Sequence, residues 1–232
     1  MGFSVHLLPG RQGRCHFQRG KTESDRISGV PEKHITVVYN GAVLSRFHPA
    51  RHRPEDTLQL IYVGRLIEEK GVQTILKALA SLPEVDYRFT VVGDGDYREP
   101  LQALARELGI ADRVTFLGTR SDVPELLADA DVFVHLPDCA EGFGIAVVEA
   151  MASGLICVCG DRGALPEIVE DGVSGFLVKN NEPAALAEIL RAISRDPDSE
   201  VYRNLRAGAV KAARNYSIEA FAEKLDRLLE EV

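Results

Sequence analysis

Apolar residues recur at regular spacing from residue 58 to the end of the chain. Six runs of apolar and β-branched residues have the length of buried strands, and several of them end at a glycine. These predicted strands lie at residues 58–63, 87–92, 113–117, 131–135, 155–159 and 175–178. Apolar residues at helical spacing fill the intervals and predict helices at 71–82, 97–108, 123–128, directly after the loop 136–144, and at 164–169. Three more helices are predicted at 183–195, 199–214 and 217–231, with Asp198 or Ser199 and Ser217 as N-caps of the last two.

Strands that alternate with helices predict right-handed βαβ units. The expected fold class is α/β, a Rossmann-like parallel sheet with helices on both faces, followed by C-terminal helices. Ligands bind such sheets beyond the carboxyl ends of the strands, near the point where the strand order reverses. Gly64, Gly93, Gly118 and the loop 136–144 all follow predicted strands, so we expect them to gather at this edge.

The chain before residue 58 lacks this regularity. Residues 1–34 have no sustained period and are expected to be partly disordered, whereas residues 35–39 predict one strand that closes at the turn Asn40-Gly41. The following stretch contains two prolines and no periodicity, which predicts a linker. The expected parts are therefore residues 1–45, the linker 46–57, and an α/β domain at 58–232 that includes the C-terminal helices.

The composition, with 45% hydrophobic and 27% charged residues, is that of an ordinary soluble globular protein. No apolar run approaches the roughly 20 residues that cross a membrane, and the N-terminal segment lacks the features of a signal peptide. The net charge of −8 is unevenly distributed, because residues 1–53 hold nine Lys and Arg against three Asp and Glu (+6), which leaves 18 against 32 (−14) for the remainder. A basic arm could bind nucleic acid, but this one lacks interleaved aromatic residues, and the acidic remainder disfavours that partner.

The four cysteines, Cys15, Cys139, Cys157 and Cys159, form neither a Cys-x-x-Cys pair nor a zinc-binding pattern with histidine. Cys157 and Cys159 alternate in an apolar run, so on a strand both point to one face as small buried residues. This usage fits a reduced, cytoplasmic protein.

A glycine-rich loop with a glutamate at each end leads into a predicted helix. Its sequence is Glu141-Gly-Phe-Gly-Ile-Ala-Val-Val-Glu149. The start of a helix carries unpaired N–H groups and a partial positive charge, so it favours phosphate or another anion, and glycines allow the ligand to approach closely. If the segment were all helical, the two carboxylates would lie about 12 Å apart, which disfavours a hydrolytic pair. The interpretation is that they bind different parts of one extended ligand.

The first predicted strand of the α/β domain ends in a second charged segment, Gly64-Arg65-Leu-Ile-Glu-Glu-Lys70-Gly71. A guanidinium and an ammonium just past a strand end suit a diphosphate. Taken alone, the same residues are typical of a solvated first turn, and His135 is typical of a polar residue that ends a strand rather than of a catalyst. Combined with the anion-binding loop at 141–149, however, the segment 64–71 is better interpreted as part of a diphosphate site.

Together these motifs resemble a known family. The segments 64–71, 141–149 and 149–154, with Leu-Pro-Glu-Ile-Val-x-x-Gly-x-x-Gly-Phe-Leu-Val at 165–178, look like the donor-binding half of a retaining glycosyltransferase. The type is the two-domain GT-B fold, family 4 (group 1, glycogen-synthase-like), and the resemblance covers about residues 35–231. The chain departs from the pattern at Cys139, Leu155 and Ala164, where serine, proline and glycine are usual.

The resemblance implies a role for each matched residue. Arg65 and Lys70 would hold the diphosphate of a nucleotide-sugar and stabilise the leaving group, and Glu141 would contact the sugar hydroxyls; these three are the expected catalytic residues. Glu149 would accept hydrogen bonds from the ribose. The remaining donor-binding residues would be Gly64, the backbone N–H groups of Phe143, Gly144 and Ile145, and, more weakly, the main chain at Arg120 beside the base. No metal is implied, because the two basic side chains and the helix dipole would do the work that a divalent ion does elsewhere. No other cofactor is implied either, because the nucleotide-sugar is the substrate.

The family also has an N-terminal acceptor-binding domain, of which residues 1–45 would be a remnant. The expected activity, in the complete enzyme, is transfer of a hexose from a UDP-, GDP- or ADP-sugar to a sugar, lipid or polysaccharide acceptor. The alternative is a truncated, non-catalytic nucleotide-sugar-binding module that needs a separate acceptor-binding chain, and a third hypothesis is an epimerase or phosphorylase on the same fold. Peripheral membrane association would come only through the N-terminal domain. In the family that domain also supplies part of the surface against which the last helix packs.

Overall fold

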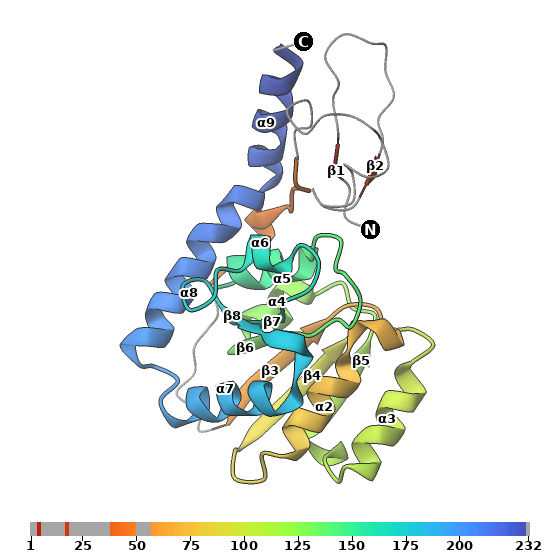
Figure 1. Cartoon of the computed structure of the whole chain (residues 1–232). Helices are drawn as coiled ribbons and strands as arrows, with labels where there is room; N and C mark the ends of the chain where they lie inside the picture. Colours follow the sequence, from red (N-terminus) through yellow and green to blue (C-terminus); the bar gives the residue numbers. More distant parts are fainter. Residues whose placement is uncertain (1–3, 6–16, 19–37, 50–56, 231–232) are drawn as a thin grey trace.

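A six-stranded sheet lies at the centre of the computed structural model, which describes residues 4–5, 17–18, 38–49 and 57–230 (Figure 1). Every neighbouring pair in this sheet is parallel, and the order is β5-β4-β3-β6-β7-β8. The strands are β3 (Leu58–Val63), β4 (Tyr87–Val92), β5 (Val114–Gly118), β6 (Val132–His135), β7 (Ile156–Gly160) and β8 (Phe176–Val178).

The strand order reverses between β3 and β6. From β3 the chain moves outward through β4 to β5, and it then returns to place β6 on the other side of β3, where Leu60 pairs with both Phe89 and Val132. The carboxyl ends of β3 and β6 therefore flank the position where ligands bind in sheets of this topology, and the region around these two strand ends is called the crevice below.

Two layers of helices cover the sheet because successive strand residues point to opposite faces. On β3, Leu60 and Tyr62 enter one buried cluster and Ile61 enters the other. The first cluster is covered by α2 (Val72–Ala80), α3 (Arg98–Glu107) and α7 (Pro183–Arg195). The second is covered by α4 (Val123–Ala128), α5 (Ile145–Ala152), α6 (Leu165–Ile168) and α8 (Glu200–Ala213).

The last helix, α9 (Ile218–Glu230), runs away from the sheet beyond α8, as Figure 1 shows, and none of its residues is buried. It is tied to the chain before the linker, since the Ala42 carbonyl accepts from Ile218 N at 2.9 Å. The remaining elements are short: an antiparallel pair, β1 (Ser4–Val5) and β2 (Phe17–Gln18), and the 3₁₀ turns η2 (Leu44–Arg46), η3 (Glu68–Lys70), η4 (Ala111–Arg113), η5 (Lys179–Asn181) and η6 (Arg214–Tyr216).

The predicted fold class and the predicted strands and helices from residue 58 onward are confirmed, with boundaries that differ by one or two residues. The expected N-caps form: Ser199 Oγ accepts from Tyr202 N at 3.4 Å, and Ser217 Oγ accepts from Ala220 N at 3.1 Å. Cys157 and Cys159 are buried on one face of β7.

The predictions for the first part of the chain fall mostly on residues 1–3, 6–16, 19–37 and 50–56, which lie outside the described ranges. Of the strand predicted at 35–39, only Val38 and Tyr39 are described, and neither is in a strand. The pairing there is made instead by Ala42, whose N–H donates to the Tyr216 carbonyl at 2.8 Å. The three-part domain division stays a prediction.

Candidate functional site

The crevice at the carboxyl ends of β3 and β6 brings together the two charged segments that the sequence singles out. The η3 turn follows β3, and the segment 136–141 follows β6. Gly71, at φ 72°, makes their close approach feasible, because a Cβ there would lie 1.7 Å from the Leu136 carbonyl oxygen. The backbone also joins the two segments, since Asp138 N donates to the Glu69 carbonyl at 2.9 Å.

Three ionisable side chains meet in this crevice. Lys70 Nζ lies 2.7 Å from Glu141 Oε2, and His135 Nε2 lies 3.0 Å from the same oxygen. All three side chains are largely buried, with 16%, 14% and 6% of the Lys70, Glu141 and His135 side chains exposed. The second carboxylate oxygen, Oε1, accepts from Gly142 N at 3.1 Å. Both oxygens of Glu141 are thus held in place before any ligand arrives.

The charge state of Glu141 follows from these contacts. Burial by itself raises the pKa of the carboxyl group, but the hydrogen bonds from His135 and Lys70 outweigh it and lower the pKa to about 2. Glu141 is therefore ionised at neutral pH, and His135 donates its Nε2 hydrogen to it.

His135 is fixed by its surroundings more firmly than the sequence suggests. Its ring stacks on the Tyr62 ring, with centroids 5.9 Å apart, and its Nδ1 has no hydrogen-bond partner among the described residues. In the sequence, His135 is visible only as a polar residue that closes an otherwise apolar strand, shortly before an acidic loop. The sequence pattern indicates His135 only as a strand-end residue and does not predict its contact with Glu141.

Arg65 follows Gly64 at the end of β3 and is exposed. Its guanidinium forms no ion pair with any carboxylate in the described ranges, although its carbonyl accepts from the Tyr62 hydroxyl at 3.1 Å. A guanidinium beside the crevice that is not engaged by these carboxylates is available to an anionic ligand.

The glycine-rich loop ends where α5 begins. Gly144, at φ 89°, is the N-cap of α5, and Ile145 at its first position is 45% exposed, so the helix start faces outward. The Phe143 side chain points inward and is 3% exposed. It stacks on Tyr39 at 6.2 Å and meets the edge of Tyr216 at 5.6 Å. The buried Phe143 side chain therefore anchors the glycine-rich loop to the protein core.

Two further predicted residues lie outside the Lys70–Glu141 cluster. Glu149, half-buried on α5, has its pKa raised by burial, an effect that the charge of Arg46 partly offsets. Arg120 follows β5, and its exposed guanidinium binds Asp122, with Nε 2.7 Å from Oδ1. The Arg120 side chain is thus occupied within the chain, which leaves the main chain as the contact that the sequence predicts.

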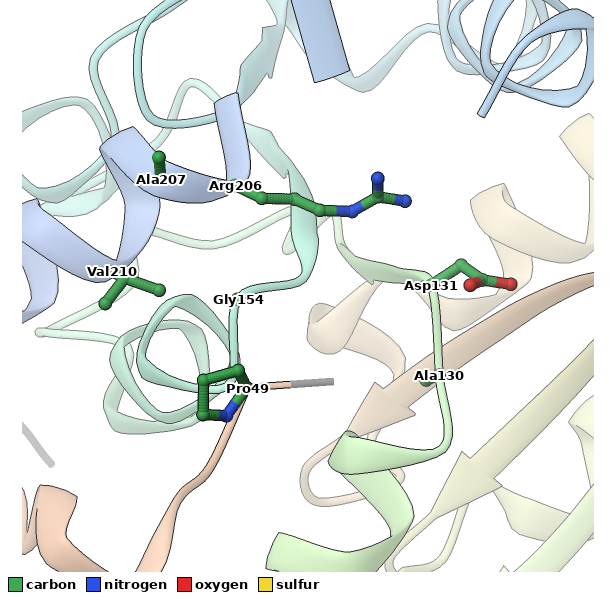
Figure 2. A pocket seen from close by; sticks show the side chains of 7 residues that line it. All are labelled: Pro49, Ala130, Asp131, Gly154, Arg206, Ala207 and Val210. Carbon is green, nitrogen blue, oxygen red and sulfur yellow. The ribbon is translucent and has the colours of Figure 1, made fainter. Parts of the chain in front are cut away.

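Two cavities lie elsewhere on the described part of the molecule. One, of about 190 Å³, opens at the amino-terminal edge of the sheet, where Asp131 precedes β6 and Gly154 precedes β7. Figure 2 shows Arg206 extending from α8 toward the side on which Asp131 lies. The other, of about 230 Å³, lies between η2 and α4. Asp131 lies at the strand end opposite to His135, so the first cavity is separate from the crevice.

Among the described residues, no group of three or more His, Cys, Asp or Glu side chains is arranged to hold a metal ion. The helices in those ranges are also too short or too polar to span a bilayer.

Comparisons with known proteins identify the family. The family model described as glycosyl transferases group 1 matches residues 45–215. The putative colanic acid biosynthesis glycosyltransferase WcaL of Escherichia coli K12 is 32% identical over 213 residues, covering 87% of this chain and 52% of that protein. The D-inositol 3-phosphate glycosyltransferase of Streptomyces scabiei is 38% identical over 208 residues, covering 79% of this chain and 45% of that protein. This chain spans about half the length of these relatives.

One solved structure of similar fold contains a bound nucleotide. Alr3699/HepE of Anabaena, in complex with UDP and glucose, superimposes with a TM-score of 0.78 and is 27% identical. The match covers 88% of this chain and 59% of that one. The comparisons thus show the family and the fold of this chain.

Proposed function

The chain belongs to the group 1 glycosyl transferases, and from this we propose that it is the donor-binding domain of a retaining family 4 glycosyltransferase. The complete enzyme transfers a hexose from a nucleotide-sugar to a sugar, lipid or polysaccharide acceptor. In that reaction the bond between the anomeric carbon and the diphosphate oxygen breaks, and a bond forms to an acceptor hydroxyl oxygen. The hydroxyl proton leaves with the diphosphate or passes to a base.

One observation carries the proposal: where the strand order reverses, a largely buried Lys–Glu pair lies close to the end of β3, which Arg65 follows with a guanidinium that no described carboxylate engages. Lys70 uses one of its three N–H donors on Glu141 and keeps the others for phosphate oxygens. Arg65 contributes a two-pronged donor, and the start of α5 contributes unpaired N–H groups. Together they oppose the charge that develops on the leaving diphosphate, and this kind of stabilisation is usually the largest catalytic contribution.

Glu141 supports the sugar end of the same proposal. Because its pKa lies far below neutrality, it presents a carboxylate that can accept hydrogen bonds from sugar hydroxyls without taking up a proton. Its two oxygens are already oriented by Lys70, His135 and Gly142, so little ordering is needed on binding. Glu149 and the main chain at Arg120 are assigned to the ribose and the base.

A UDP-sugar is the first donor to test, since UDP and glucose are bound by the Anabaena neighbour; GDP- and ADP-sugars are the others. The proposal places the reaction in the cytoplasm and needs no divalent ion, because Arg65, Lys70 and the helix start neutralise the diphosphate. Addition of EDTA should therefore leave nucleotide binding unchanged.

The test is the melting temperature of the chain with UDP, GDP and ADP, and with the matching nucleosides as controls. A diphosphate that binds at 100 times its dissociation constant stabilises the folded chain by about 2.7 kcal/mol, while the nucleosides should have a much smaller effect. If none of the three diphosphates raises the melting temperature, the donor-site proposal is wrong. If one does, and a panel of acceptors gives no transfer, the chain is a binding module that needs a partner chain for the acceptor.

A further inference from the structure

Asn181 has a backbone conformation that normally belongs to glycine. It ends η5, directly after β8, at φ 52°, and is the sole non-glycine residue with positive φ in the described ranges. Its side chain is nevertheless buried, at 5% exposure. Asparagine tolerates this conformation better than most residues but less well than glycine. A buried amide at such a position points to a task for the side chain.

The amide group of Asn181 is directed at the segment that leads to Glu141. Nδ2 donates to the Pro137 carbonyl at 2.6 Å, and Leu136 O and Asp138 Oδ1 lie 3.4 and 3.3 Å from it. Space for the other end of the amide comes from Gly160, since a Cβ there would lie 2.3 Å from Asn181 Oδ1. The two N–H groups of one amide are thus shared among three acceptors on three consecutive residues.

The same segment is fastened on its far side to the turn that carries Lys70. Asp138 N and Cys139 N both donate to the Glu69 carbonyl, at 2.9 and 3.4 Å. Gln73 Nε2 bridges Asp138 Oδ2 at 3.1 Å and the Glu68 carbonyl at 2.9 Å. Residues 136–138 are therefore held between Asn181 on one side and η3 on the other.

We propose that Asn181 is a positioning residue, which acts through residues 136–138 to set the distance between Lys70 and Glu141 and so the affinity for the diphosphate of the donor. Residues 136–138 end three positions before Glu141, whose carboxylate meets Lys70 at 2.7 Å. Without the amide, three acceptors lose their donor, and residues 136–138 can move away from η3. The role in donor binding rests on the function proposed above, whereas the effect on the segment does not.

Two substitutions separate the side chain from the backbone. Asn181→Gly removes the amide and suits the positive φ, so backbone strain is relieved and not added. Asn181→Asp keeps the shape but replaces the donor with a carboxylate oxygen that faces three other oxygens. Asn204→Asp, the same change at an exposed position of α8, is the control. We expect both Asn181 variants to bind UDP about tenfold more weakly than wild type in calorimetric titrations, and the control to bind normally.

The pH dependence of Asn181→Asp distinguishes positioning from general destabilisation. At acidic pH the carboxyl group of the variant can take up a proton and donate one hydrogen bond, so part of the UDP affinity lost relative to wild type should return. If wild type binds UDP and both Asn181 variants bind it as tightly as wild type does, the positioning role is overturned.

A second measurement needs no nucleotide, and so distinguishes failure of this inference from failure of the proposed function. The amides of Asp138 and Cys139 should exchange with solvent about tenfold faster in Asn181→Gly than in wild type, as expected for the loss of one or two net hydrogen bonds. Unchanged exchange at both amides would overturn the inference even if UDP binding were lost. Faster exchange with no nucleotide binding in wild type would leave the segment's role standing and refute the donor site.

Discussion

Lys70 and Glu141 are 71 positions apart in the sequence, yet their side chains form a largely buried ion pair with Nζ 2.7 Å from Oε2. Breaking such a pair by removing one partner is costly, because the other charge is left in a poorly solvated place. The pair lies where the strand order reverses, and His135 donates to the same carboxylate oxygen. The structural role of this pair and its proposed role in donor binding can be separated by measuring stability and affinity in the same variants.

Glu141→Gln tests the charge on this pair through the pH dependence of stability. The carboxyl pKa falls from its ordinary value of 4.5 to about 2 on folding. A carboxylate with a lowered folded-state pKa stabilises the protein above its unfolded pKa, and this contribution disappears as pH falls through 4.5 toward 2. We expect wild type to be more stable than Glu141→Gln by about 2–3 kcal/mol at pH 7, with the difference shrinking below about pH 4.5. Urea unfolding at pH 7, 5 and 3 measures it.

The partner variant provides the control for that experiment. Lys70→Met alone should be destabilising, while Lys70→Met combined with Glu141→Gln should cost less than the sum of the two, since the second change removes the stranded charge. Additive losses would show that the two side chains do not interact in solution.

Arg65→Ala should weaken UDP binding while leaving the stability of the chain almost unchanged. The Arg65 side chain has no ion-pair partner among the described carboxylates, so its loss should change the free energy of unfolding by no more than about 0.5 kcal/mol. Loss of a charge-assisted contact with a diphosphate should still weaken UDP binding by about tenfold or more. Arg195→Ala, which removes an exposed arginine at the end of α7, is the matched control. Equal UDP affinities for the two variants would remove Arg65 from the site.

The regular elements could be predicted because their signals are local. Each strand from β3 to β8 is a short apolar run, and each large helix has apolar residues at helical spacing, so neither depends on knowing what lies opposite. The motif at 141–149 was equally visible, because a glycine-rich turn directly before a helix is a distinctive local pattern. The fold class follows from these local signals, whereas the family was indicated by the resemblance of the motifs.

The contacts that give the crevice its geometry could not be predicted, because they join segments far apart in the sequence. Nothing near His135 or Lys70 shows that both reach one oxygen of Glu141. The inward orientation of Phe143 depends on Tyr39 and Tyr216, which lie far from it in the sequence on either side. Asn181 was missed for the same reason, although an asparagine just before a helix that starts with proline is a weak local sign of a positive φ.

Glu149 is expected to lower the stability of the free chain and to raise its affinity for UDP. Burial raises its pKa, and a raised carboxyl pKa means that the ionised form is less favourable in the folded chain than in the unfolded one. Its charge therefore destabilises the protein above the folded pKa, and this penalty vanishes below the unfolded pKa. Glu149→Gln should accordingly raise the melting temperature of the free chain at pH 7 but not at pH 3. If Glu149 accepts hydrogen bonds from the ribose, the same variant should bind UDP more weakly; higher stability with undiminished affinity would exclude that role.

The close approach of η3 to the segment after β6 can be tested with a matched pair of glycines, which have nearly the same backbone conformation but different surroundings. Gly71 and Gly109 have φ of 72° and 71°. A Cβ on Gly109 would meet no atom within 4 Å, whereas one on Gly71 would lie 1.7 Å from the Leu136 carbonyl oxygen. Alanine at either position carries the conformational penalty of about 1–2 kcal/mol for a left-handed residue. Only alanine at position 71 must also push backbone away from backbone.

We therefore expect Gly109→Ala to lose about 1–2 kcal/mol of stability and to bind UDP like wild type. Gly71→Ala should lose several kcal/mol more, because backbone, unlike the end of a side chain, moves only with its segment. The displacement separates η3 from residues 136–138 and so draws Lys70 away from Glu141, which should weaken UDP binding in whatever fraction remains folded. Urea unfolding of the two variants side by side, followed by titration with UDP, measures both effects. Equal losses in stability and affinity for the two alanine variants would show that Gly71 and the Leu136 carbonyl are not in close contact.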